Sequence, residues 1–190
     1  MAIAKRQVQI NRGNLIATLR SLNGYEILAK GVEALSRQDL EAATYIYDYL
    51  MMRRRAKFSK SLRSMIIEEF DTEPVKFLAL AHDIAQKYKP KTKGTNKVYV
   101  ILLDGFLKNG RHGLYVGQTS RTIENRFKQH LTGGALSAKC YKKMKCLLPS
   151  LYCHLSPMSK KESLEIEEAL ADDFRSAGIR TEGGRKKKPT

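Results

Sequence analysis

The sequence predicts an α/β protein in which an α-helical N-terminal region precedes a small mixed or antiparallel sheet flanked by helices. Three observations support this fold class. Apolar residues recur at helical spacing through the first ninety residues, the period changes to that of strands at residues 98–118, and helical spacing returns at residue 122. A chain of 190 residues can hold one medium domain or two small ones.

The helices of the N-terminal region have recognisable start and stop signals. We interpret Asn23-Gly24 as the end of the first helix, and Ser36 with Asp39 as a capping box that opens another. Asp71-Thr72, ahead of Pro74, predicts a further helix start. The apolar residues that fall on the inner faces of these helices are Leu15, Leu19, Leu22, Leu40, Ala43, Tyr47, Leu50, Leu78, Ala81, Ala85 and Tyr88.

A polar stretch without large apolar groups, KPKTKGTNK, follows the helical region of residues 1–89. It predicts a linker over residues 90–97. Two strand-like runs come next, VYVILL at 98–103 and LYVGQ at 114–118, and the turn-rich DGFLKNGRHG separates them. The simplest interpretation is a hairpin with a long loop.

Two more helices complete the second domain, which we predict over residues 98–184. The first covers residues 122–131 and stops at Gly133-Gly134. Ser159 with Glu162 resembles a capping box that opens the second, which runs to about residue 177 before Gly178. A basic tail, residues 185–190, ends the chain.

The charge balance favours a polyanionic partner. The chain has 35 Lys and Arg against 19 Asp and Glu, a net charge of +16 and a pI near 9.8. Such an excess favours nucleic acid through counterion release, although a basic protein without such a partner stays an alternative.

Several classes of protein are disfavoured by what the sequence lacks. No run of 18 apolar residues predicts a membrane span, and the first residues lack the apolar segment of a secretory signal. Three irregularly spaced cysteines fit neither a disulfide framework nor structural zinc. We therefore expect a cytoplasmic protein with no membrane partner.

Two tyrosines occupy equivalent places in the predicted strands. Tyr99 and Tyr115 each lie between apolar residues, so both point away from the face that those neighbours cover. In an antiparallel pair the two phenols can lie side by side, either as chemical groups or as a pair that stabilises the sheet. Gly117 follows directly and allows a bulge or close approach of another group, or simply ends the strand.

Three charged or titratable positions on the predicted helices could act on a phosphate. Arg126 and His130 share one helix face, where an arginine can hold a phosphate and a histidine can move a proton, or both can belong to an ordinary basic face. Glu167 lies among apolar residues of the last helix, as a solvated neighbour or as a Mg²⁺ ligand. Spacing alone does not choose between Glu167 and its neighbours Glu165 and Glu168.

Together these pieces resemble the GIY-YIG nuclease family. The first motif reads VYV at 98–100, which keeps the tyrosine and lacks the first glycine, and the second reads YVG at 115–117. The family's arginine and histidine fall on Arg126 and His130, because Arg121 precedes the helix, and its glutamate fits Glu167 in SLEIEEAL. Many members also carry an asparagine after the glutamate helix, where this chain has Thr181 and Gly183-Gly184.

The resemblance implies metal-dependent hydrolysis of phosphodiester bonds. Glu167 would hold Mg²⁺ or Mn²⁺, and Arg126 would neutralise charge on the phosphate. Tyr99 would act as the base with His130 lowering the cost of its ionisation, and Tyr115 would position the phosphate. Which tyrosine is the base stays open.

Basic residues outside the motif are candidates for binding the nucleic acid. The residues that we expect to contact it, with Gly117, are Arg53, Arg54, Arg55, Lys142 and Lys143. The helical region could bind DNA, pack against the core or form a homodimer. The leading prediction is a DNA endonuclease of restriction or defence type acting on double-stranded DNA. The alternatives are a repair or mobile-element nuclease and a non-catalytic nucleic-acid-binding protein of the same fold.

Overall fold

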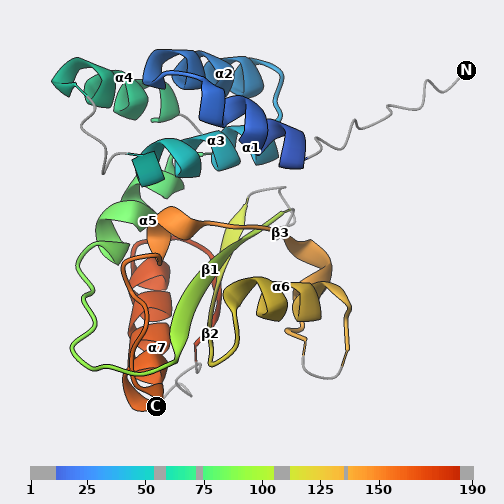
Figure 1. The fold of residues 1–190 in the computed structure, drawn as a ribbon, viewed down its shortest axis with the longest axis vertical. Helices are drawn as coiled ribbons and strands as arrows, with labels where there is room; N and C mark the ends of the chain where they lie inside the picture. Colours follow the sequence, from blue (N-terminus) through green and yellow to red (C-terminus); the bar gives the residue numbers. More distant parts are fainter. Residues whose placement is uncertain (1–11, 54–58, 72–74, 105–111, 135–136, 185–190) are drawn as a thin grey trace, which may run out of the picture.

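The computed structural model describes residues 12–53, 59–71, 75–104, 112–134 and 137–184. It places a layer of four helices over the end of a four-stranded sheet (Figure 1). The helices of this layer are α1 (Arg12–Ser21), α2 (Gly24–Ser36), α3 (Leu40–Arg53) and α4 (Lys60–Phe70). Helix α5 (Phe77–Ala85) connects the layer to the sheet. No described helix has the length and apolar character needed to cross a bilayer.

Of the helix boundaries predicted in this layer, the stop at Asn23-Gly24 agrees with the structure and the start at Ser36 is wrong. α1 ends at Ser21, and Asn23 then caps α2. Its side chain accepts from the backbone N–H of Glu26, while the Glu26 carboxylate accepts from that of Asn23. Ser36 is the last residue of α2, and the cap of α3 is Asp39, whose Oδ1 accepts from Ala42 N at 3.1 Å. The start signal before Pro74 lies partly outside the described residues, and α5 begins at Phe77.

A buried carboxylate joins the helical layer to the sheet domain. Asp48 of α3 is 4% exposed, and its Oδ1 accepts from the backbone N–H of Ser150 at 2.9 Å. Ser150 belongs to the 3-10 helix η2 (Pro149–Leu151). Burial raises the pKa of Asp48 to about 7, although the Ser150 hydrogen bonds act in the opposite direction. The two parts of the chain therefore share a polar contact inside their interface.

The sheet confirms the predicted α/β class and the hairpin. Strands β1 (Lys97–Leu103) and β2 (Gly113–Thr119) pair antiparallel, with Tyr99 opposite Gly117 and Ile101 opposite Tyr115. Two short strands that the sequence did not predict complete the order β3-β1-β2-β4. Strand β3 (Met144–Leu147) is antiparallel to β1, whereas β4 (Thr181–Gly183) is parallel to β2.

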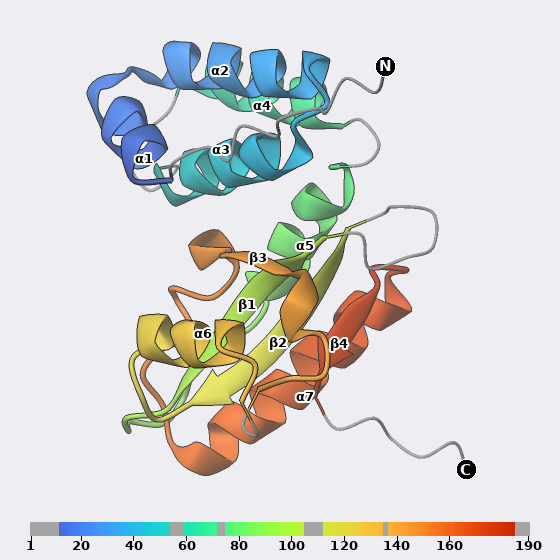
Figure 2. The ribbon, with the colours of Figure 1, turned by 90° about the vertical axis from the view of Figure 1, so that its right-hand side faces the viewer.

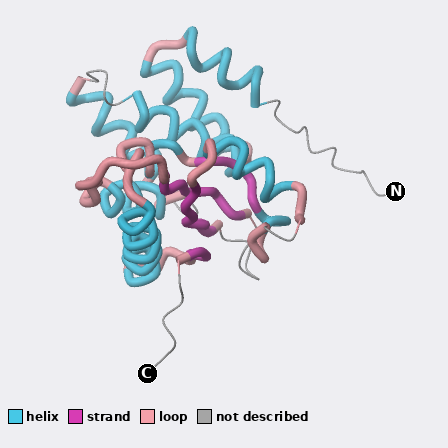
Figure 3. Tube along the Cα trace, turned by 60° about the horizontal axis from the view of Figure 1, so that its bottom comes forward, coloured by secondary structure: helices cyan, strands magenta, loops and turns pink. Residues whose placement is uncertain are grey.

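Two helices lie on opposite sides of this sheet, α6 (Ile123–Leu131) and α7 (Lys160–Ser176) (Figures 1 and 2). Thr122 caps α6 by accepting from Asn125 N at 3.3 Å, and Ser159 caps α7 by accepting from Glu162 N at 3.2 Å. The predicted second capping box is only half formed, because the Glu162 carboxylate accepts from Lys91 N and Thr92 N instead. The predicted linker thus makes direct contact with α7. The Cα trace in Figure 3 shows the strands at the centre of the molecule with helices around them.

Candidate active site

The two predicted tyrosines lie together on the face of the sheet that α6 covers. Their ring centroids are 6.1 Å apart, along a diagonal of the β1–β2 ladder because Tyr99 faces Gly117 rather than Tyr115. Tyr99 is fully buried, whereas Tyr115 is only partly buried. A Cβ atom at Gly117 would lie 2.5 Å from the Tyr99 hydroxyl and 2.8 Å from the Tyr115 ring. Glycine is therefore required here for both phenols to occupy one site.

His130 is fully buried and is fixed by hydrogen bonds at both ring nitrogens. Its Nε2 lies 2.8 Å from the Tyr99 hydroxyl, and its Nδ1 accepts from the backbone N–H of Ala138 at 3.1 Å. Because Nδ1 is an acceptor, the proton of the neutral imidazole is on Nε2, which then donates to the Tyr99 oxygen. Burial, and next the charge of Arg126, lower the pKa of His130 to about 4. The ring is therefore a neutral donor near neutral pH.

Arg126 lies one helical turn before His130 and is half-buried. Its Nη1 donates to Gln129 Oε1 at 2.7 Å, and its positive charge acts on the Tyr99 phenol. Burial raises the pKa of the Tyr99 phenol, and Arg126 opposes that rise. Burial also raises the pKa of Tyr115, as do Tyr99 and the nearby charge of Glu167.

Glu167 is half-buried on the second turn of α7. Its charge acts on both tyrosines, raising the pKa of each, so its carboxylate is close enough to share their electrostatic environment. Its neighbour Glu165 is exposed. The structure therefore clusters Tyr99, Tyr115, Arg126 and His130, and the charge of Glu167 acts on both tyrosines of this cluster. The catalytic roles of the five residues stay predictions.

The basic residues predicted to bind nucleic acid fall into separate groups. Lys142 and Lys143 are exposed on the 3-10 helix η1 (Tyr141–Lys143), which packs beside α6. Arg53 belongs to the helical layer, where it donates to Leu22 O at 2.9 Å and lies over the Tyr49 ring. Arg54 and Arg55 lie outside the described residues.

Two groups at the site escaped the sequence reasoning. The Ala138 backbone N–H, which determines the His130 tautomer, carries no signal in the side-chain pattern. Gln129 could have been found from its spacing of three residues from Arg126 on one helix. At the position of the family's asparagine, Thr181 is buried and its hydroxyl donates to Ile179 O at 3.0 Å, so it holds its own loop.

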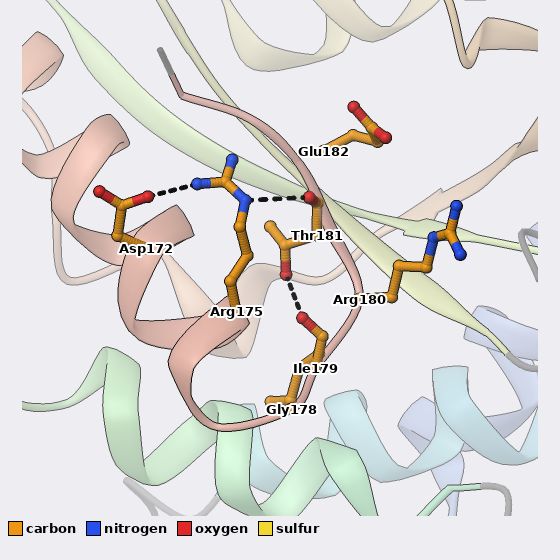
Figure 4. Close-up of a pocket in the computed structure, with 7 residues that line it drawn as sticks. All are labelled: Asp172, Arg175, Gly178, Ile179, Arg180, Thr181 and Glu182. Atoms are coloured by element: carbon orange, nitrogen blue, oxygen red, sulfur yellow. Dashed lines mark hydrogen bonds and ion pairs between the residues drawn. The ribbon is translucent and has the colours of Figure 1, made fainter. Parts of the chain in front are cut away.

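A hollow of about 560 Å³ at the C-terminal end of α7 is lined by none of the five candidate catalytic residues (Figure 4). Arg175 donates to the backbone oxygens of Thr181, at 3.2 Å, and Gly183, and it pairs with Asp172. These contacts attach β4 to α7. The hollow is therefore a structural feature of that connection.

Comparison with known proteins identifies the domain. Residues 96–180 match the family model described as the GIY-YIG catalytic domain, a range that covers both tyrosine strands, α6 and α7. No curated protein and no solved structure matches the chain. The match implies a nuclease domain whose substrate is nucleic acid. Residues 96–180 of this chain match the GIY-YIG catalytic domain.

Proposed function

We propose that this protein is a metal-dependent DNA endonuclease. The observation that carries the proposal is the cluster of Tyr99, Tyr115, Arg126 and His130 beside the Glu167 carboxylate, within a nuclease domain. This cluster combines oxygen, cationic and hydrogen-bond-donor groups, which phosphodiester hydrolysis requires.

The residues at the site suit one hard divalent cation. Glu167 supplies a carboxylate, and the described residues hold no group of three or more His, Cys, Asp or Glu that would form an all-protein metal cage. Mg²⁺ is commonly bound by one or two carboxylates, with waters and substrate phosphates as its remaining ligands. Glu167 would therefore hold Mg²⁺ or Mn²⁺, which when bound would stabilise charge on the phosphate and the leaving oxygen.

Arg126 and Tyr115 act on the phosphate itself. The guanidinium of Arg126 is charged at all relevant pH values and neutralises the charge that develops on the nonbridging oxygens. Its bond to Gln129 holds it on the face of α6 that carries His130. The phenol of Tyr115 is the less buried of the two, so it is placed to position the phosphate by hydrogen bonding.

Tyr99 orients the attacking water and, in its ionised form, takes the proton from it. A phenolate at this buried position is costly, so it requires donors and positive charge around its oxygen. The Nε2–H of His130 and the charge of Arg126 supply both. His130 is poorly suited to be the base, because accepting a proton at Nδ1 would break its bond from Ala138.

The substrate that we propose is double-stranded DNA, in a restriction or defence role. The net charge of +16 and the exposed lysines of η1 support a long phosphate contact. One active site cleaves one strand at a time, so a double-strand break requires a homodimer or two successive events. A repair or mobile-element role fits the same chemistry.

A plasmid nicking assay tests the proposal. With Mg²⁺, we expect the wild type to convert supercoiled DNA to the open form, and Glu167→Gln to be slower by about 10³-fold. The matched control is Glu165→Gln, which removes an equal charge from an exposed position two residues away and should cleave at the wild-type rate. EDTA should abolish cleavage by all three proteins.

The second candidate function is binding without cleavage. The observation that favours it is Thr181, whose hydroxyl donates its one proton to Ile179 O and therefore cannot donate to a phosphate in place of the family's asparagine. If the wild type binds plasmid DNA but shows no metal-dependent cleavage, the binding-only function replaces the nuclease.

A further inference from the structure

The segment between the helical region and the sheet is an ordered basic strap rather than a free connection. We call residues 89–97, with the sequence KPKTKGTNK, the lysine strap. It carries Lys89, Lys91, Lys93 and Lys97 and no acidic residue. The first three of these lysines are exposed. Its charge is therefore concentrated on a surface that solvent and ligands can reach.

The lysine strap is attached through its backbone and one hydroxyl. The Glu162 carboxylate accepts from Lys91 N at 2.6 Å and Thr92 N at 2.9 Å, and the Thr92 hydroxyl also bonds to it. That hydroxyl accepts in turn from Ser159 N at 2.9 Å. These donors, with the Thr92 hydroxyl as the strongest, hold the pKa of Glu162 below its ordinary value. The hydrogen bonds of this attachment thus come from backbone N–H groups and one hydroxyl, while the charge of Lys91 also acts on Glu162.

The second half of the strap lies directly on the residues that precede α7. Asn96 and Met158 exchange both backbone hydrogen bonds, at 3.0 and 2.9 Å. A Cβ atom at Gly94 would lie 2.2 Å from the Met158 carbonyl oxygen, so only glycine fits there without displacing backbone. The backbone of the strap is thus held in place in its first half by Glu162 and in its second half by Met158.

The strap leads into the candidate active site. Lys97 begins β1 two residues before Tyr99, and residues two apart on a strand share one face of the sheet. The beginnings of β1, α6 and α7 lie at the same end of the domain (Figure 2). Lys160 and Lys161 at the start of α7 are exposed beside the strap residues that Ser159 and Glu162 hold. Positive charge therefore lies at the end of the domain where β1, the strand of Tyr99, begins.

We propose that the lysine strap binds the phosphate backbone of duplex DNA next to the phosphate that is cleaved. The identity of the partner rests on the proposed function, whereas the fixed path and charge of the strap do not. Ammonium groups contact phosphates without reading sequence, so the strap holds the duplex in position rather than selecting a site. Pre-fixing its backbone lowers the entropy that binding would otherwise cost.

The dependence of DNA binding on salt tests the proposal. A fluorescein-labelled duplex is titrated with full-length protein in EDTA, which prevents cleavage, at several salt concentrations. Each phosphate contact contributes a slope of about 0.9 to the plot of log affinity against log salt. We expect Lys89→Gln/Lys91→Gln/Lys93→Gln to flatten that slope by about 2 to 3.

The control is Lys30→Gln/Arg37→Gln/Lys76→Gln, which removes the same net charge from exposed positions on α2, directly after α2 and before α5. These three cations form exposed ion pairs with Glu33 or Asp71, which contribute little in water. Its slope should equal that of the wild type. Equal slopes for the two triple variants would overturn the proposal and leave only a general charge effect. Because the readout is binding without metal, absence of cleavage would contradict the proposed function and leave the strap proposal standing.

A charge-neutral variant tests whether the attachment matters. Thr92→Val keeps the size of the side chain and all the lysines but removes the hydroxyl that joins Glu162 and Ser159. We expect about fivefold weaker binding at one salt concentration, because the freed segment must be ordered on binding. Amide hydrogen exchange at residues 91 and 92 should be faster, which shows that the attachment has been loosened. Faster exchange with unchanged affinity would show that the fixed path is irrelevant to binding.

Discussion

Gly31 in the helical layer and Gly117 in the sheet each leave room for an aromatic ring that is almost fully buried. A Cβ atom at Gly31 would lie 2.6 Å from the Phe70 ring, and one at Gly117 would lie 2.6 Å from Cζ of Tyr99. The sites differ in what the ring does. Phe70 packs on Tyr47 with ring centroids 5.1 Å apart, whereas Tyr99 carries a hydroxyl bonded to His130. The same requirement for a glycine therefore allows apolar packing in the helical layer and a hydrogen-bonded polar cluster in the sheet.

The comparison shows why burial alone does not identify a reactive group. Phe70 is 1% exposed and Tyr99 is 0% exposed, so both rings are core residues by accessibility. Only Tyr99 lies beside a cation, a second phenol and an imidazole whose donor atom is fixed. A site is distinguished by the partners of its polar atoms, since a buried polar group without partners would be destabilising.

The largest expected effect is that of Tyr99→Phe on the cleavage rate. This substitution removes the hydroxyl and leaves an apolar ring in the sheet, as Phe70 is in the helical layer. We expect cleavage to fall by about 10³-fold, because the oxygen that orients or deprotonates the water is gone. Affinity for DNA should be unchanged. Single-turnover cleavage with Mg²⁺ measures the effect, and Tyr115→Phe, expected to lose about tenfold, is the matched control. A near wild-type rate for Tyr99→Phe would transfer the base role to Tyr115 or His130.

Alanine substitutions at the two glycines should have smaller effects, on the cleavage rate for Gly117 and on stability for Gly31. Gly117→Ala displaces both phenols, and a misplacement of this kind should lower the cleavage rate by about 10²-fold. Gly31→Ala displaces Phe70, and we expect a loss of about 1 kcal/mol of stability, since overpacking is partly offset by better helix propensity. Rates and thermal melts of both variants provide the measurement. If Gly31→Ala cleaved more slowly at an unchanged melting temperature, the idea that Gly31 acts only on stability would be contradicted.

The sequence was sufficient for the elements whose signal is local. The change from helical to alternating periodicity gave the hairpin, and the i, i+4 spacing placed Arg126 and His130 on one face, as the structure has them. The two short strands β3 and β4 were missed, because three or four residues carry too little periodicity. Ser36 was misassigned because two cap-forming residues stand three apart and only Asp39 bonds to the next helix.

The parts of the site that depend on tertiary contacts could not be derived from side-chain patterns. Spacing left Glu165, Glu167 and Glu168 equivalent, and only the folded chain puts the charge of Glu167 beside the tyrosines. The His130 tautomer depends on the backbone N–H of Ala138, which every residue except proline would supply. Glu162 was predicted to close a capping box, but its carboxylate binds a segment 70 residues away.

Asp48→Asn, at the junction of the two regions, should have a smaller effect than the two substitutions that slow cleavage. The pKa of Asp48 in the fold, about 7, is above its ordinary value of 3.8, so its contribution to stability is fully present below pH 3.8 and is lost as the pH rises through 7. Asparagine can still accept from Ser150 N but carries no charge to bury. We therefore expect the variant to be more stable than the wild type by about 2 kcal/mol at pH 8, with little difference at pH 4. Urea unfolding at the two pH values measures this. If the variant were less stable than the wild type at pH 8, the ionised carboxylate of Asp48 would be required at the junction. The junction would then resemble the polar cluster of the sheet more than the apolar packing at Gly31.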